Sequence, residues 1–274
     1  MAIKRLLIAV FALWFAGNAW ATLPVQHWQT STGARVYFVE NRGLPILDVS
    51  VDFPAGSGAD TPERSGTASL TRHLLSAGAD GLTEDDISRA MADVGAVLGG
   101  RFDQDRAGLS LRTLSSERIQ ALDVFSRVLQ KPEFPEKILE REKVRVIAAL
   151  KEAETRPENI VDRTFTRLLY GDHPYGLQGS GEIETVSRIQ RQDLLDFYRG
   201  RYLAGSAVVA IMGDLSRAEA EAIAESLTRG LPRGQQAAPL PPVPAPRRET
   251  VQRIPHPATQ AHINMGYPGV SRND

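Results

Sequence analysis

Residues 66–78, which read GTASLTRHLLSAG, carry the spacing at which this chain could bind a metal. Two His side chains four positions apart lie on one face of a helix. A Glu directly before the second His then completes a zinc site with a general base. Here the three positions are Ser69, Arg72 and His73. One of two His ligands is therefore present, and a cation stands where the base would be.

Arg72 opposes metal chemistry at this site in two ways. A unit charge and a divalent ion about 5 Å apart repel each other by roughly 6 to 7 kcal/mol at an effective dielectric constant near 20. The guanidinium also stays protonated, so it cannot act as a base. Zinc sites need three or four protein ligands, and His73 alone is far short of that. We call the positions of Ser69, Arg72 and His73 the zinc-site frame. The residues at these positions predict that the segment does not bind zinc.

The other His residues offer weaker alternatives. His173 precedes Pro174 in a loop, where a turn element is the favoured interpretation over a metal ligand. His256 and His262 are six positions apart on two predicted strands and could reach one metal if both strands form. We disfavour that site, but the pattern leaves it open.

Hydropathy and turn residues predict the elements that must position His73. Residues 36–40 and 47–53 alternate apolar and polar side chains, as strands do, and the turn at residues 41–45 joins them. Ser65 or Thr67 is the expected cap of the helix that carries His73. Thr83 and Asp86 resemble a capping box. Further helices are predicted over residues 83–94, 115–129, 136–154, 160–169, 191–198 and 218–227, and further strands over residues 107–112 and 207–212.

The chain divides into four stretches. Residues 1–21 resemble a cleavable signal peptide, with Lys4 and Arg5 before a short apolar run and a small-x-small site before Thr22. Residues 22–231 form the first predicted domain, and residues 232–247 are a Pro-rich linker. Residues 248–274 hold two predicted strands, over residues 249–254 and 260–266. They are too few to bury a core, so we expect the start of a truncated second domain.

Composition excludes several classes of function. The chain has 274 residues with 32 Lys and Arg against 33 Asp and Glu, so nothing indicates nucleic-acid binding. It has no Cys, which removes disulfides, thiolate metal sites and Cys nucleophiles. An exported protein without a lipid-anchored Cys is expected in the periplasm.

Several short motifs occur together in one order. They are the strand and Gly turn at residues 51–58, the Gly-x-Ala frame at 66–68, KPEFP at 131–135, YGDHPYG at 170–176, the paired tyrosines within 193–202, and Gly213-Asp214. In this order the chain resembles the first half of a pitrilysin/insulinase-family protein. The resemblance implies an α+β fold, a mainly antiparallel sheet flanked by helices, like one half of a mitochondrial processing peptidase.

The resemblance also implies the roles of the site residues. The family's first His ligand falls on Ser69, its Glu base on Arg72, its second His ligand on His73 and its Glu ligand on Ala149. Two of three ligands and the base are then absent. The resemblance therefore predicts an inactive homologue that binds no cofactor of its own.

Family members of this kind imply a heterodimer. An intact partner subunit would carry the zinc, and the two chains together would enclose and process an unfolded peptide. The peptide would add to a sheet edge, which we expect at Gly99, Gly100, Arg101 and Phe102. Two alternatives stay open: a stand-alone peptide-binding or scaffold protein without peptidase activity, and a zinc metallopeptidase with unrecognised ligands.

Overall fold

A computed structural model describes residues 24–235, 238–243, 245, 248–257 and 259–270. The predicted signal peptide at residues 1–21 lies outside the described residues. No helix in the described part is long and apolar enough to cross a membrane.

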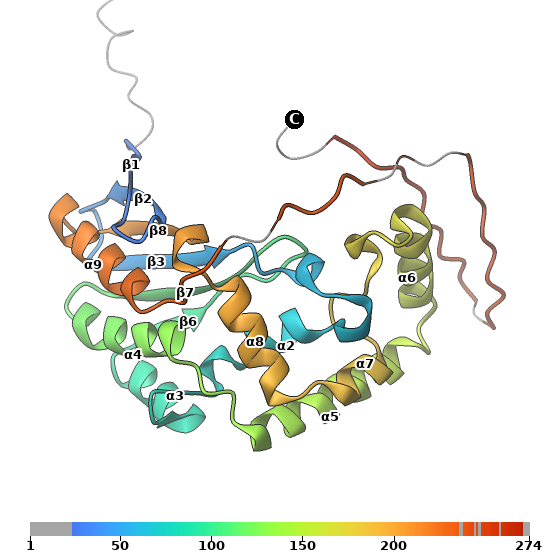
Figure 1. Cartoon of the computed structure of the whole chain (residues 1–274), viewed down its shortest axis with the longest axis horizontal. Coiled ribbons are helices and arrows are strands. Elements are labelled where there is room, and N and C mark those ends of the chain that lie inside the picture. Colours follow the sequence, from blue (N-terminus) through green and yellow to red (C-terminus); the bar gives the residue numbers. More distant parts are fainter. Residues whose placement is uncertain (1–23, 236–237, 244, 246–247, 258, 271–274) are drawn as a thin grey trace, which may run out of the picture.

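One six-stranded sheet organises the molecule (Figure 1). Its order is β1-β2-β8-β3-β7-β6, with β2 and β8 parallel and the other neighbours antiparallel. The strands are β1 Gln26–Gln29, β2 Arg35–Glu40, β3 Ile46–Phe53, β6 Val97–Gly99, β7 Ala107–Leu114 and β8 Val208–Gly213. A separate two-stranded hairpin pairs β4 Gly78–Ala79 with β5 Leu82–Thr83. The predicted α+β class with a mainly antiparallel sheet is confirmed.

Alternation along the strands gives the sheet two different faces. In β3 every second residue is buried, ending at Val51 and Phe53, while Asp48 and Ser50 point to the opposite face. Successive side chains of a strand point to opposite sides, so one face is apolar and the other is left to polar groups. Arg112 of β7 pairs with Asp48 across that second face, with Nε and Oδ1 2.6 Å apart. Helices therefore need to cover only the first face.

The helices are α2 Thr67–Leu74, α3 Glu84–Asp93, α4 Arg118–Gln130, α5 Glu136–Ala153, α6 Pro157–Tyr170, α7 Ile183–Arg188, α8 Arg191–Arg201 and α9 Arg217–Arg229. In Figure 1, α2, α3, α4 and α8 lie together on one side of the sheet. The predicted capping box is present, because the Thr83 side chain accepts from Asp86 N and the Asp86 carboxylate accepts from Thr83 N. The helix after it begins where the sequence indicated.

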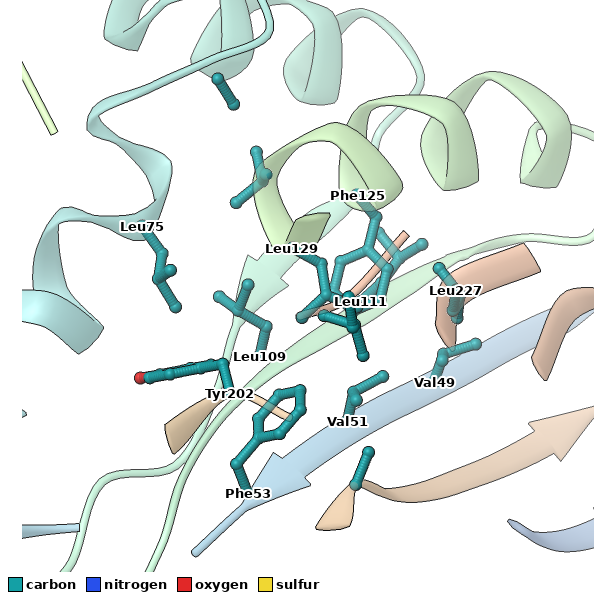
Figure 2. Close-up of a cluster of buried hydrophobic side chains, with 14 of the residues drawn as sticks. Val49, Val51, Phe53, Leu75, Leu109, Leu111, Phe125, Leu129, Tyr202 and Leu227 are labelled. Atoms are coloured by element: carbon teal, nitrogen blue, oxygen red, sulfur yellow. The ribbon is translucent and has the colours of Figure 1, made fainter. Parts of the chain in front are cut away.

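The core forms where the apolar sheet face meets α4, α9 and the end of α8. Figure 2 shows this cluster, with Phe125 and Leu129 from α4 and Leu227 from α9 over the strands. The sheet contributes Val49, Val51, Phe53, Leu109 and Leu111, all at most 2% exposed. Tyr202 is fully buried beside Phe53, with ring centroids 4.8 Å apart. The core therefore packs β3, near the start of the first predicted domain, against the residue after α8, near its end.

Five short strands and helices escaped the sequence patterns, namely β1, β4, β5, β6 and α7. Each is six residues or fewer, which is too short for a periodic signal. β6 forms because residues 97–99 pair with β7, from Val97 opposite Arg112 to Gly99 opposite Ser110. Pairing with a distant strand, rather than local alternation, defines it.

The strands predicted over residues 249–254 and 260–266 are wrong for the described part of these segments, which has no strand. A strand exists only through hydrogen bonds to a neighbour, and no described ladder includes these residues. The second segment instead passes α6, where Asn264 Nδ2 lies 2.5 Å from Asp162 Oδ1. The apolar residues of this alternating pattern, Ile263, Met265 and Tyr267, are more than 80% exposed, so they are not part of a core.

Candidate functional site

The helix with the zinc-site frame, α2, is held at its start by a carboxylate from outside the helix. Asp60 is 7% exposed and accepts from Gly66 N at 2.8 Å and Ala68 N at 2.9 Å. The N-cap is Gly66, at φ +97°, so the expected cap at Ser65 or Thr67 is wrong. A positive φ favours Gly, and Asp60 supplies the acceptor that a capping side chain would otherwise provide.

Burial disfavours the charged form of Asp60. It raises the pKa of this carboxyl to about 7, although hydrogen bonds from Ala68 and Gly66 and the charge of Arg201 act in the opposite direction. The start of α2 therefore depends on a group that titrates near neutral pH.

The side chain of Arg72 contacts the sheet edge. Its Nε donates to the backbone carbonyl oxygen of Arg101 at 3.3 Å. Burial lowers the pKa of Arg72, while nearby Tyr202 and Asp52 raise it. The guanidinium thus joins α2 to the segment after β6.

His73 pairs with a residue that the sequence did not indicate. Its Nε2 lies 3.2 Å from Oε2 of Glu142, on α5. Glu142 is 3% exposed and also accepts from Arg145 Nη1 at 2.9 Å and Arg141 Nε at 3.1 Å. His73 itself is largely exposed. The partner of His73 is thus a carboxylate from a different helix.

The surroundings of Glu142 favour its ionised form. Burial alone would raise the pKa of Glu142, but hydrogen bonds from Arg145 and Arg141 and the charge of His73 outweigh it, so the pKa lies below the ordinary value of 4.5. Because the carboxylate is already shared among cations, binding a metal would require breaking those contacts.

The remaining two predicted positions take no part in these contacts. Ser69 lies half-buried on α2, and Ala149 is exposed on α5. Ala149 follows Glu142 by seven residues, which is about two helical turns, so both lie on nearly the same face of α5. That shared face is the sequence signal by which Glu142 could have been found.

The donor set does not fit zinc. The described residues contain no group of three or more His, Cys, Asp or Glu that could hold a metal ion. His73 and Glu142 are two donors, and Arg72, Arg141 and Arg145 bring positive charge to the same region. The site supports ion pairing and backbone contacts, and we derive no metal-dependent step from it. His256 and His262 are exposed and lie on no strand, so the premise of a shared metal there fails.

The candidate peptide edge lies at the end of the sheet. β6 is the last strand in the order, Gly99 belongs to it, and Phe102 bridges Ala107 just beyond it. A Cβ on Gly100 would lie 2.6 Å from Arg72 Nη2 and 2.8 Å from Leu109 Cα. Gly100 thus lets Arg72 approach the backbone of this edge. A terminal strand presents backbone groups to which another strand can add.

A mainly antiparallel sheet, covered on one face by helices, with Ser69, Arg72 and His73 at zinc-ligand spacing on α2, defines a metallopeptidase-like α+β domain. Residues 35–181 match the family model described as insulinase (peptidase family M16), and residues 188–274 match the one described as peptidase M16 inactive domain. The chain belongs to the insulinase family of peptidases, family M16. β8, within the second match, lies between β2 and β3 of the first, so both matches contribute to one sheet.

Known proteins of this family resemble the chain over most of its length. An uncharacterized zinc protease of Mycobacterium leprae is 29% identical over 86% of this chain and 50% of its own. A probable mitochondrial-processing peptidase subunit beta of Arabidopsis thaliana is 27% identical over 68% of this chain and 35% of its own. The chain spans half or less of the length of these curated relatives.

A solved structure extends the similarity to three dimensions. The crystal structure of a peptidase M16 inactive domain from Pseudomonas fluorescens is 36% identical, with a TM-score of 0.80 over 82% of this chain and 55% of that one. The resemblance to the pitrilysin/insulinase family is confirmed.

Proposed function

We propose that this chain is a non-catalytic, peptidase-like subunit that pairs with a zinc-bearing family member. Together the two chains would enclose and process peptides in the periplasm. The chain would hold no cofactor of its own, and the partner would supply the zinc. By itself it would not be an enzyme.

The observation that carries this proposal is the position of Arg72. Its guanidinium stands where the family has its Glu base and is bound to the carbonyl oxygen of Arg101. His73, the one surviving ligand, is paired with Glu142. Arg72 cannot replace that Glu as a general base, because its guanidinium stays protonated.

The sheet edge supports a role in holding peptide. Gly99 ends β6, the strand at the edge of the sheet, and Gly100, Arg101 and Phe102 follow it. Arg72 contacts the same segment. Strand addition to such an edge gives main-chain hydrogen bonds to any unfolded peptide. A peptide bound here needs no chemistry from this chain.

Relatives named as the beta subunits of processing peptidases support a multi-subunit assembly. Since the chain spans half or less of those relatives, the partner and substrate stay proposals. The predicted signal peptide supports export and a mature chain that starts at Thr22.

The test is affinity purification of the full chain from its native periplasm, with zinc analysis of the complex and of the isolated chain. Zinc and peptidase activity only in a complex with a second family member would support the proposal. Capture without a family partner and without zinc would favour the stand-alone binding or scaffold function. About one zinc per isolated chain would overturn the assignment of Ser69, Arg72 and Ala149.

A variant series tests the positional assignment separately. Ser69→His, Arg72→Glu and Ala149→Glu together restore the family's ligand types and its base. Zinc bound by the triple variant, measured by metal analysis after dialysis, would support the assignment. The single variant Ala149→Glu is the matched control, because it adds a carboxylate while Arg72 stays. Equal zinc content in the two variants would contradict the assignment.

A further inference from the structure

Among the contacts of the Pro-rich linker with the first domain, the one at His173 has no role in the proposed function. His173 lies in the loop between α6 and α7, at the start of the short 3-10 turn η4 Pro174–Gly176. It is 7% exposed, and its Nε2 lies 2.8 Å from the carbonyl oxygen of Pro241. A polar side chain that is nine-tenths buried is thus committed to the linker backbone.

The second ring nitrogen determines the direction of this hydrogen bond. His173 Nδ1 accepts from the backbone N–H of Tyr175 at 3.1 Å. A nitrogen that accepts carries no proton in a neutral imidazole, so the ring proton is on Nε2. His173 therefore donates to Pro241, and both nitrogens are used. This arrangement explains why His173 is not available as a metal ligand.

Apolar contacts accompany the hydrogen bond. A Cβ on Gly58, in the 3-10 turn η1 Ser57–Ala59, would lie 2.9 Å from Leu240 Cδ1 and 3.1 Å from Tyr175 Cε1. The absence of a side chain at Gly58 leaves room for Leu240. The rings of His173 and Tyr175 are 4.8 Å apart, and Tyr170 packs edge-on against Tyr175 at 5.7 Å. Aromatic surfaces of this kind are typical binding sites for polyproline segments, whose extended shape is preformed.

We propose that residues 170–176 and Gly58 form a docking site for the chain's own polyproline segment, residues 239–242, and that His173 anchors it. The occupant has the sequence Pro-Leu-Pro-Pro. Docking fixes the direction in which the chain leaves the first domain. His173 is a positioning residue for everything that follows the linker.

The docking site lies beside the candidate peptide edge. Gly58 N donates to the carbonyl oxygen of Gln104 at 2.8 Å, and Ser57 N donates to that of Asp103 at 3.1 Å. The same turn that contacts Leu240 therefore supports the loop directly after Phe102. The turn at Ser57–Ala59 would therefore lie against both the docked linker and the loop next to a peptide bound at the edge. Docking of the linker does not depend on whether Ser69, Arg72 and His73 bind zinc.

The experiment uses spin-label mobility in the full mature chain, which has no Cys of its own. A nitroxide at Val243→Cys reports on the linker, two residues beyond Pro241. A slow-motion spectrum is expected with the native docking site. His173→Ala should remove the slow component, and His173→Gln should retain part of it because the amide can still donate a hydrogen bond.

Two controls separate docking from folding. A second chain labelled at Ala148→Cys, on the exposed side of α5, should give the same spectrum with and without His173→Ala. Leu240→Ser changes only the linker and should also mobilise the label at residue 243. If His173→Ala also changes the spectrum of the label on α5, docking of the linker is judged from the Leu240→Ser spectrum alone. An equally mobile label at residue 243 with the native site and with Leu240→Ser would overturn the proposal.

Discussion

Arg72 and Arg101 connect α2 to the sheet edge, through a hydrogen bond from Arg72 Nε to the Arg101 carbonyl oxygen at 3.3 Å. In an intact site of this type the position of Arg72 belongs to a catalytic base. Here the same position supports the backbone to which we expect a peptide to add. If Arg72 replaces the base, as we propose, the residue at this position makes a structural contact in place of a catalytic one.

Arg72→Met should therefore loosen the edge. The variant keeps an apolar stem but removes the donor, at an expected cost of about 1–3 kcal/mol for a hydrogen bond to a charged group. Amide hydrogen exchange over residues 99–103 should become faster. Arg101→Ala is the matched control, since it leaves the backbone acceptor in place. Faster exchange in the control than in Arg72→Met would contradict this role.

Glu142 should contribute stability that is lost in acid. The pKa of Glu142 is lowered in the folded state. Its contribution to the free energy of unfolding is therefore present when the pH is above the unfolded pKa of about 4.5, and it disappears as the pH falls through the lower folded pKa. Glu142→Gln should cost about 1–3 kcal/mol at pH 7, a modest value because the Arg partners are largely exposed. Urea unfolding at pH 7 and pH 3.5 checks this. An equal difference between variant and native protein at both pH values would count against it.

Asp60 should act in the opposite direction. Burial raises its pKa to about 7, so its contribution to stability is greatest below the ordinary value of 3.8 and is lost as the pH rises toward 7. A pKa that differs by one between the folded and unfolded states corresponds to about 1.4 kcal/mol of stability. Asp60→Asn keeps one acceptor for the start of α2 and removes the titration. The native free energy of unfolding should fall relative to that of the variant between pH 4.5 and pH 8, and a constant difference would refute this.

Two buried tyrosines provide a matched pair. Tyr198 Oη donates to the carbonyl oxygen of Leu129 at 2.8 Å, whereas the buried Tyr202 hydroxyl has no hydrogen-bond partner among the described residues. Tyr198→Phe leaves a buried carbonyl without its donor and should cost about 1 kcal/mol. Tyr202→Phe removes an unsatisfied group and should be neutral or stabilising. Thermal unfolding of both variants tests the order, which would be wrong if Tyr202→Phe were the more damaging change.

Local patterns predicted most of the long elements. β3 and α5 carry clear periodicity, and the capping box at Thr83 marks the start of α3. The predicted strands after the linker failed because alternation alone does not supply a pairing neighbour. The cap of α2 was misplaced because its acceptor, Asp60, lies outside the helix.

The sequence by itself determined which ligand types are present on α2. Ser69, Arg72 and His73 share a helix, and their spacing is a property of any helix. Through its resemblance, the sequence also indicated the family and the class of fold. That the chain binds no zinc of its own stays a prediction.

Only the tertiary structure decided what these residues contact. His73 meets Glu142, Arg72 meets Arg101, and His173 meets Pro241, each across a long separation in the chain. Such contacts depend on how α2 packs against α5 and the sheet, and on where the linker passes. Packing is set by many small apolar contacts summed over the whole core, so no single motif encodes it.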